Sequence, residues 1–402
     1  MRWIVPWRCS SRYSGKWWGE PVPRLKLAIV TQFPADAGVP RGGVEAVSVN
    51  LVRSLAVTGE LEVHVVTLDP AVTVAATAEW AGAHIHRLPR AAASELGNAL
   101  GAGRRAIQAR LLELAPDIVH AHDTYGLMVQ GLALPRVFTI HGFIYGDTLV
   151  SGQKFPWLRS KVWEHFEKRG WADQPHIISI SPYVRERLAG VSAAVIHDID
   201  NPIAADFFDI ERVERPGVVF CAAAICPRKN PLVLVEAAAR LQQRGIAVEL
   251  RLAGAVTDEG YGERVRQAVA AHRLEAQVRL LGLIGTAQVR SELAQAAVFA
   301  LVSLEENSPM GIEEAMAARV PVLTSNRCGM PYMVRHGETG FLVDPLDVAD
   351  VARRLETLLA DAPRRAAMGT AAREVALARF HPQAVARRTL EVYREIVTAA
   401  RD

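Results

Sequence analysis

Short apolar runs alternate with amphipathic stretches along almost the whole chain from residue 25 onward. In the first half, the apolar runs predict strands at 25–30, 63–67, 118–121, 137–140, 177–180 and 194–197. Helical periodicity predicts helices between most of them, at 44–56, 104–114, 158–171 and 183–188. Buried apolar strands that alternate with helices are typical of a parallel sheet with helices on its faces.

The same rhythm starts again after Asn201-Pro202. Strands are expected at 217–221, 248–252, 278–281, 298–301 and 321–324, and helices at 231–244, 263–272, 287–295 and 312–318. This order predicts two doubly wound α/β domains that face each other, with ligands bound in the cleft beyond the strand ends. Three final helices are expected at 348–359, 366–378 and 382–400, and the last is expected to pack back on the first domain.

Composition and charge narrow the class of protein. Half of the 402 residues are apolar, which suits two globular domains. The net charge is +3, but residues 1–24 carry +4 and leave −1 for the rest, so general nucleic-acid binding is not expected. Four scattered cysteines form no zinc or disulfide pattern and favour a reducing cytosol. No uninterrupted apolar run approaches the ~18 residues that would span a bilayer.

Residues 1–24 combine tryptophans and prolines with basic residues. No apolar core precedes a small-residue cleavage site, so a signal peptide is not expected. We expect a flexible extension or an over-long gene start, because chain termini are in general loosely ordered. The alternative is an arm that contacts a membrane surface, where tryptophan and arginine are favourable.

The strongest chemical signal lies at 303–317. Glu306 follows the carboxyl end of an apolar strand, and Pro309 and Gly311 shape a turn that opens a helix. Free backbone N–H groups and the helix dipole at such a turn suit an anionic diphosphate. Glu314 is expected in the first helical turn, within reach of ribose hydroxyls. Helix capping by acidic residues is the alternative explanation for both carboxylates.

Two further turns follow first strands. Gly42 and Gly43 lie between the first strand and the first helix, where glycine lets a ligand approach the backbone, although a plain tight turn explains them equally well. Arg228 and Lys229 follow the first strand of the second half and could neutralise a diphosphate. The alternative for these cations is a solvated pair.

Histidines mark two neighbouring strand ends. His141 ends one strand and could bond a sugar or acceptor hydroxyl, although a lone histidine is more often structural. At the other strand, His120 is expected in the core, and His122 and Asp123 are expected to line the cleft. These residues form no recognisable ligand set, so no metal is predicted.

As a set, these motifs resemble family 4 of the retaining glycosyltransferases, which have the GT-B fold of two facing Rossmann-like domains. The resemblance covers about 25–402. It rests on the Glu306-x7-Glu314 pair followed by Ala315-Met316-Ala317, on Pro321-Val322-Leu323, on Gly329 with the run 334–343, on Gly42-Gly43, on Thr139-x-His141-Gly142, on Ser179-x-Ser181, and on Phe380 to Tyr393.

The resemblance implies a domain plan and roles for the site residues. It implies an acceptor-binding domain at 25–203, a nucleotide-sugar-binding domain at 204–381 and a closing helix at 382–402. Catalytic roles would fall to His141, Glu306 and Lys229. Donor contacts would come from Gly42, Gly43, Arg228, Lys229, Leu283, Ser308, Pro309, Met310, Gly311 and Glu314.

The implied activity is transfer of a hexosyl unit from a UDP- or GDP-sugar to a glycan or lipid-linked acceptor. The family's reaction is usually described as attack on the same face of the sugar, with the leaving phosphate taking the acceptor's proton. No metal or other cofactor is expected. The resemblance thus predicts a cytoplasmic enzyme of polysaccharide or glycolipid biosynthesis.

Two departures from the family pattern leave an alternative open. Family members usually carry Gly-Arg where this chain has Ala223-Ala224, and Asn307 to Met310 replace the common Gly-Phe-Gly-Leu. Arg228 could substitute for the missing arginine. Otherwise, the donor is unusual or the chain is a catalytically weak member that serves as a binding or partner subunit. An epimerase on the same fold is less favoured, because the segment around Glu306 suits transfer.

Peripheral membrane contact is a separate hypothesis. The predicted helix at 157–171 carries aromatic and basic residues together, which suits a bilayer interface. They are Trp157, Trp163, Phe166 and Trp171, with Arg159, Lys161, Lys168 and Arg169. The alternative is a helix packed on its own domain.

Overall fold

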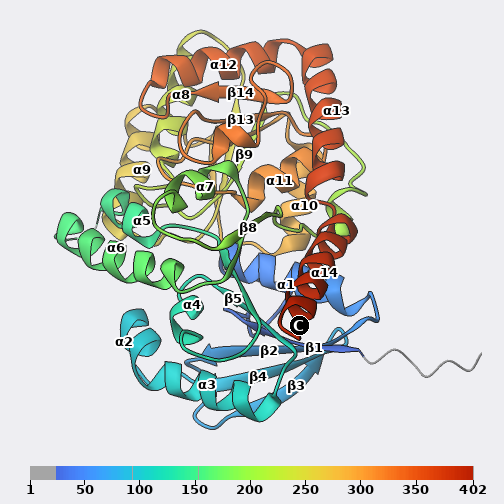
Figure 1. Ribbon diagram of the computed structural model, residues 1–402. Helices are drawn as coiled ribbons and strands as arrows, with labels where there is room; N and C mark the ends of the chain where they lie inside the picture. Colours follow the sequence, from blue (N-terminus) through green and yellow to red (C-terminus); the bar gives the residue numbers. More distant parts are fainter. Residues whose placement is uncertain (1–23, 93, 153, 402) are drawn as a thin grey trace, which may run out of the picture.

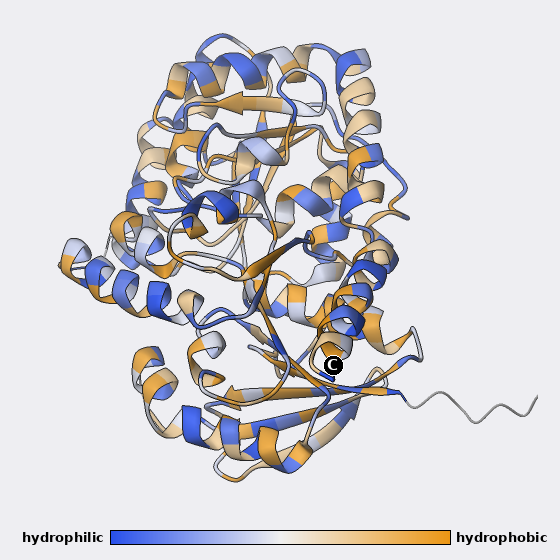
Figure 2. Cartoon of the chain, viewed as in Figure 1, coloured by the Kyte–Doolittle hydropathy of each residue, from blue (hydrophilic) through white to orange (hydrophobic). Residues whose placement is uncertain are grey.

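A computed structural model describes residues 24–92, 94–152 and 154–401. Apart from Arg24, the N-terminal extension lies outside the described residues, so both hypotheses about it remain predictions. Two α/β domains follow each other along the chain, and Figure 1 shows one above the other. In Figure 2 the strands of both sheets are mainly apolar, whereas the outer helices alternate polar and apolar positions.

The first domain contains an eight-stranded sheet in the order β3-β4-β2-β1-β5-β6-β7-β8. Its strands are β1 (Leu25–Val30), β2 (Leu61–Asp69), β3 (Ala76–Trp80), β4 (Ala83–Pro89), β5 (Ile118–His122), β6 (Arg136–Ile140), β7 (His176–Ser179) and β8 (Val195–Asp198). All pairings are parallel except β3 with β4. Neither β3 nor β4 was predicted, because β3 is almost wholly exposed and in β4 polar His84, His86 and Arg87 interrupt the apolar positions.

The helices of the first domain are α1 (Gly43–Ala56), α2 (Glu95–Leu100), α3 (Ala102–Leu114), α4 (Tyr125–Met128), α5 (Ile144–Val150), α6 (Pro156–Ala172) and α7 (Pro182–Leu188). The predicted helices at 44–56, 104–114, 158–171 and 183–188 are confirmed as α1, α3, α6 and α7. Short helices α2, α4 and α5 were not predicted. Each has seven residues or fewer, too few to give a clear apolar periodicity.

The second domain contains a parallel six-stranded sheet in the order β11-β10-β9-β12-β13-β14. The strands are β9 (Val218–Ala222), β10 (Glu249–Ala253), β11 (Val278–Gly282), β12 (Val298–Leu301), β13 (Val322–Ser325) and β14 (Gly340–Val343). The helices are α8 (Pro231–Gln243), α9 (Glu259–Ala271), α10 (Thr286–Gln295), α11 (Met310–Ala317), α12 (Val348–Ala360), α13 (Ala362–Arg379) and α14 (Pro382–Ala399). The predicted pair of doubly wound domains is confirmed.

The last helix belongs to the first domain although it follows the second. Helix α14 contributes Leu390, Tyr393 and Ile396 to the hydrophobic core of the first domain, where it packs against α1 and β5. In Figure 1 it runs from the second domain down to α1 and the lower sheet. The buried Tyr393 hydroxyl bonds His120 Nδ1 at 2.7 Å. This contact ties the end of the chain to β5.

Both sheets reverse their strand order beside the cleft. In the first sheet the reversal lies between β1 and β5, and in the second it lies between β9 and β12. Loops that follow adjacent parallel strands diverge at such a point, which opens a crevice at the carboxyl ends of the strands. The loop after β1 leads to Gly42 and Gly43, and the loop after β12 leads to Glu306.

Candidate active site in the interdomain cleft

A cavity of about 510 Å³ lies between the two domains and is lined by residues of both. All the residues to which the resemblance assigns a catalytic or donor-binding role line it. These are Gly42, Gly43, His141, Arg228, Lys229, Leu283, Glu306, Ser308, Pro309, Met310, Gly311 and Glu314. The tertiary structure thus brings the segments together, while the role of each residue stays a prediction.

Glu306 is the centre of an ionic cluster. Arg228 donates a hydrogen bond of 2.7 Å to Glu306 Oε1, and Lys229 pairs with the same oxygen. The Glu306 side chain is only 10% exposed. Burial opposes its ionisation, but Lys229 and Arg228 outweigh this effect and hold its pKa below the usual value. Glu306 is therefore an anion that forms ion pairs with both Arg228 and Lys229.

Asp147, on α5 of the first domain, approaches this cluster from the opposite wall. Its Oδ2 lies 3.6 Å from Nε of Arg228, so the ionic cluster crosses the cleft. Burial raises the pKa of Asp147 to about 6, although Arg228 acts against this shift. The sequence analysis missed Asp147. No local motif marks it, since only the fold of the unpredicted helix α5 turns it toward Arg228.

Helix α11 starts at the cleft with open backbone N–H groups. Its N-cap is Pro309, whose side chain accepts no hydrogen bond, and no other capping side chain is found among the described residues. The helix begins at Met310, so Glu313 lies in the first turn. The prediction that Glu314 lies there was wrong, because the helix starts two residues earlier than its apolar pattern suggested. An uncapped helix start attracts anions.

The two glutamates of α11 face different surroundings. Glu313 is fully buried and accepts a 2.7 Å hydrogen bond from the Ser308 hydroxyl. Glu314 lines the cleft, and burial raises its pKa to about 8. Glu314 is therefore mostly protonated at neutral pH, so its carboxyl group can both donate hydrogen bonds to hydroxyl groups and accept them.

The glycine loop of the first domain faces α11. Gly42 is the N-cap of α1 in an extended conformation, with φ −166°. A Cβ added to Gly42 would meet no described atom within 4 Å, whereas one on Gly43 would lie 4.0 Å from Cγ of Met310. The loop therefore leaves open space beside Gly42 and approaches the other wall at Gly43.

His141 is held from behind by β5. Its backbone N–H donates to Asp123 Oδ1 at 2.7 Å, and its Nε2 lies 3.0 Å from His122 Nδ1. Burial lowers the pKa of His141 to about 4, so the imidazole is neutral at pH 7. His120 is buried as predicted, and Asp123 lines the cleft as predicted. His122 does not line this cavity; it is buried behind His141.

Asn307 fastens the two walls of the cleft together. Its side-chain oxygen accepts a hydrogen bond from the Ser181 hydroxyl, and its amide donates to the Ile140 carbonyl at 3.3 Å. Tyr183 also donates across the domains, to Glu305 Oε1 at 2.8 Å. The substitution of Asn307 for the usual family residue therefore creates contacts between the domains.

Neither a metal cluster nor a membrane-spanning helix is found in the part of the chain that the structure describes. Among the described residues, no group of three or more His, Cys, Asp or Glu side chains is arranged to hold a metal ion. No helix in the described ranges is long and apolar enough to cross a bilayer.

Family models and related sequences agree on one class of protein. The model for glycosyl transferases group 1 matches residues 203–375, and the model for glycosyltransferase family 4 matches residues 41–207. A GDP-mannose-dependent alpha-(1-6)-phosphatidylinositol monomannoside mannosyltransferase of Mycobacterium tuberculosis is 34% identical over 168 residues, which are 40% of this chain and 43% of that protein. An MMP alpha-(1->4)-mannosyltransferase of Mycolicibacterium hassiacum is 28% identical over 298 residues, covering 70% of this chain and 71% of that protein.

The match to the mannosyltransferase of Mycobacterium tuberculosis thus spans less than half of that protein's length.

Solved structures share the fold. Sucrose-phosphate synthase of Thermosynechococcus elongatus has a TM-score of 0.81 at 21% identity, over 94% of this chain and 100% of that chain. Anabaena HepE in complex with UDP-glucose has a TM-score of 0.69 at 18% identity, over 92% and 100% of the two chains. With both domain models matched in order and the two-domain fold shared, the chain belongs to the group 1 glycosyltransferases of family 4, with the GT-B fold.

Proposed function

We propose that this protein transfers a hexosyl unit from a UDP- or GDP-sugar to a glycan or lipid-linked acceptor, with retention at the anomeric carbon and without a metal. Family membership supports the reaction class. The name of one relative specifies GDP-mannose as donor, and one structural neighbour was solved with UDP-glucose. These two cases support a nucleotide diphosphate as the leaving group. They do not decide whether the base of the donor is uracil or guanine.

The observation that carries the proposal is the convergence of positive charge on one point of the cleft. Arg228, Lys229 and the uncapped start of α11 all line the same cavity. When a sugar leaves a nucleotide diphosphate, negative charge develops on the phosphate oxygens. Fixed cations and N–H groups in a water-poor site stabilise that charge strongly. This arrangement can therefore assist departure of a diphosphate with no metal ion.

Glu306 controls how strongly Arg228 and Lys229 can bind the diphosphate of the donor. Both cations bond this one carboxylate. A diphosphate carries more negative charge than Glu306, so it can draw Lys229 and Arg228 toward itself on binding. A carboxylate held by two cations is also a poor nucleophile, which supports attack by the acceptor on the same face as the leaving phosphate. Neutral His141 would then serve as a hydrogen-bond partner for a sugar hydroxyl.

The second candidate is a catalytically weak binding or partner subunit. It is favoured by Ala223 and Ala224, which line the cleft where the family usually carries a cation. Without that cation, the diphosphate would lose one charge-assisted hydrogen bond.

Purified protein separates the two candidates. We expect UDP- or GDP-sugars to raise the melting temperature, because a ligand that binds only the folded state stabilises it. Donor hydrolysis and transfer should persist in EDTA, and the product's anomeric configuration, read by NMR, should match the donor's. The variant Lys229→Met serves as the inactive control. Donor binding without hydrolysis or transfer would favour the partner subunit, and loss of activity in EDTA would contradict metal independence.

A further inference from the structure

Helices α5 and α6 form a hairpin that projects from the first domain at the level of the cleft (Figure 1). Its tip exposes large apolar side chains that the fold does not bury. Phe155 is 72% exposed and Trp157 is 66% exposed. The hairpin tip consists of the exposed apolar residues Leu149, Phe155, Trp157, Leu158 and Val162.

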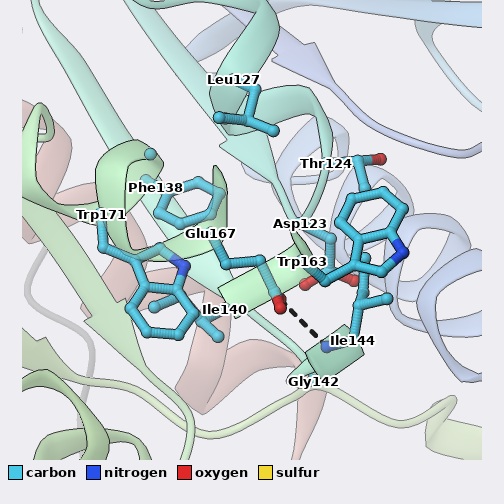
Figure 3. A pocket seen from close by; sticks show the side chains of 12 residues that line it. Asp123, Thr124, Leu127, Phe138, Ile140, Gly142, Ile144, Trp163, Glu167 and Trp171 are labelled. Atoms are coloured by element: carbon cyan, nitrogen blue, oxygen red, sulfur yellow. Dashed lines mark hydrogen bonds between the residues drawn. The ribbon is translucent and has the colours of Figure 1, made fainter. Parts of the chain in front are cut away.

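The other end of the hairpin is firmly attached to its own domain. Glu167 of α6 accepts hydrogen bonds from the backbone N–H groups of Ile144 and Tyr145, at 3.0 and 2.9 Å. Figure 3 shows this carboxylate between Trp171 and Trp163, with the bond to Ile144 marked. Trp171 is buried against Phe143. Packing on the domain thus accounts for the base of α6 and leaves the apolar side chains at the tip exposed.

Charge at the tip is one-sided. Between residues 148 and 163 the sequence contains three basic residues and no acidic one. These residues, Lys154, Arg159 and Lys161, are all exposed, although Lys161 also pairs with Glu164 of the same helix at 2.8 Å. A second copy of the chain that used the same patch would bring like charges together, which disfavours self-association through it. Exposed aromatic and aliphatic groups beside basic residues fit instead the boundary between lipid headgroups and acyl chains.

We propose that the hairpin tip docks on an anionic lipid surface. Phe155, Trp157 and Leu158 enter the interface, and the three basic residues engage the headgroup phosphates. The tip differs from the surface expected from the sequence, because Trp171 faces the core and Phe155 replaces it outside.

Docking would orient the cleft relative to the lipid. Helix α5 carries Leu149 at the tip and Asp147, two residues earlier, in the cleft wall. The loop between the helices also approaches the second domain, since a Cβ on Gly152 would lie 3.1 Å from Cγ of Pro227. A lipid-linked acceptor would therefore reach the cleft over a short path. This consequence rests on the proposed function, whereas the docking itself does not.

Vesicle flotation of the full chain tests the docking. We expect binding to vesicles of equal parts phosphatidylcholine and phosphatidylglycerol, weaker binding at high salt, and little binding to phosphatidylcholine alone. Phe155→Ser combined with Trp157→Ser should weaken binding at least about tenfold. Neutralising Lys154, Arg159 and Lys161 to alanine should weaken it about a hundredfold, at roughly fivefold for each charge. Leu112→Ser, at an exposed leucine on α3, is the matched control.

The outcomes separate docking from catalysis. Equal flotation of wild type and both tip variants, or no flotation of either, overturns the docking proposal. Loss of self-association in the tip variants, measured by sedimentation, would assign the patch to a second copy instead and also overturns it. Donor hydrolysis in solution should be unchanged in the tip variants, which shows that they are folded. Flotation without any hydrolysis would contradict the proposed function and leave the docking supported.

Discussion

Arg228 donates a 2.7 Å hydrogen bond to Glu306 while Asp147 of the other domain approaches the same guanidinium at 3.6 Å. The arginine thus lies at the junction of the two walls of the cleft. Lys229 pairs with Glu306 beside it. A bound diphosphate must compete with these carboxylates for both cations. The strength of this ionic cluster should therefore affect both the donor dissociation constant and kcat.

The variant Glu306→Gln should separate donor binding from turnover. Glutamine keeps the size of the side chain but removes the charge that holds Arg228 and Lys229. We expect kcat to fall about ten- to a hundredfold, since a hydrogen bond to a charged group contributes about 1.5–3 kcal/mol. The donor dissociation constant should stay equal or become lower, because the cations are freer. Calorimetry and initial rates test this; weaker donor binding at unchanged kcat would contradict it, and Glu356→Gln on the surface is the control.

Ala224→Arg tests the missing family cation. If the donor site is otherwise ordinary, the new guanidinium adds one charge-assisted hydrogen bond to the diphosphate. Such a bond contributes about 1.5–3 kcal/mol, so the donor dissociation constant should fall roughly ten- to a hundredfold. Isothermal calorimetry with the preferred nucleotide sugar measures it. Unchanged or weaker binding would show that Arg228 already fills this role.

Gly42→Val tests close approach of the donor to the glycine loop. Gly42 has an extended backbone, which valine adopts readily, and an added Cβ meets no described atom within 4 Å. We expect the melting temperature to stay within about 2 °C, because surface changes of this kind rarely exceed about 0.5 kcal/mol. The KM for the donor should rise several-fold. Gly260→Ala on exposed α9 is the control, and an unchanged KM would count against donor contact here.

Stability should fall as pH rises through the neutral range. Burial raises the pKa of Glu167 to about 8 from an ordinary value of 4.5, so the folded state holds a proton that the unfolded chain has lost. Folding then takes up protons, and the free energy of unfolding falls as pH rises toward 8. His120, with its pKa lowered to about 3 from 6.5, has the opposite effect, but only below its ordinary value. The fall should therefore be visible between pH 6.5 and 8.

Glu167→Gln should make this slope shallower without abolishing it, because Glu314, whose pKa is also raised to about 8, titrates in the same window. One group that titrates in the window changes the slope by about 1 kcal/mol per pH unit. Urea unfolding at several pH values measures the slope, which is informative even if the variant is less stable throughout. The exposed Glu391→Gln should keep the wild-type slope. An equal slope in both variants would mean that Glu167 does not hold the proton.

Tyr393→Phe should weaken the first domain. Its hydroxyl is 2.7 Å from His120 Nδ1 inside the core, and phenylalanine would leave that nitrogen unpaired. An unsatisfied buried polar group costs about 1–3 kcal/mol. Calorimetry should show a lower melting temperature, whereas Tyr332→Phe at a partly exposed tyrosine should change little. Equal melting temperatures for Tyr393→Phe and wild type would argue against the buried bond.

Local pattern predicted most strands of the two sheets, but not β3, β4 or β14. Strands such as β9 and β12 are buried, so their burial is visible as an unbroken apolar run. The edge strand β3 escaped prediction because it has no buried face to leave such a run. The helix at 144–150 escaped because two turns are too short to show a period.

The sequence by itself determined the two-domain α/β architecture, the family, and the segments that meet at the cleft, because strand burial and motif residues are properties of neighbouring positions. Only the tertiary structure decided that Asp147 faces Arg228, that His122 lies behind His141, and that Phe155 rather than Trp171 is exposed on the hairpin. Each of these outcomes depends on contacts between segments far apart in the chain. No local pattern encodes them, because burial and ion pairing at such positions are set by whichever distant element packs against them.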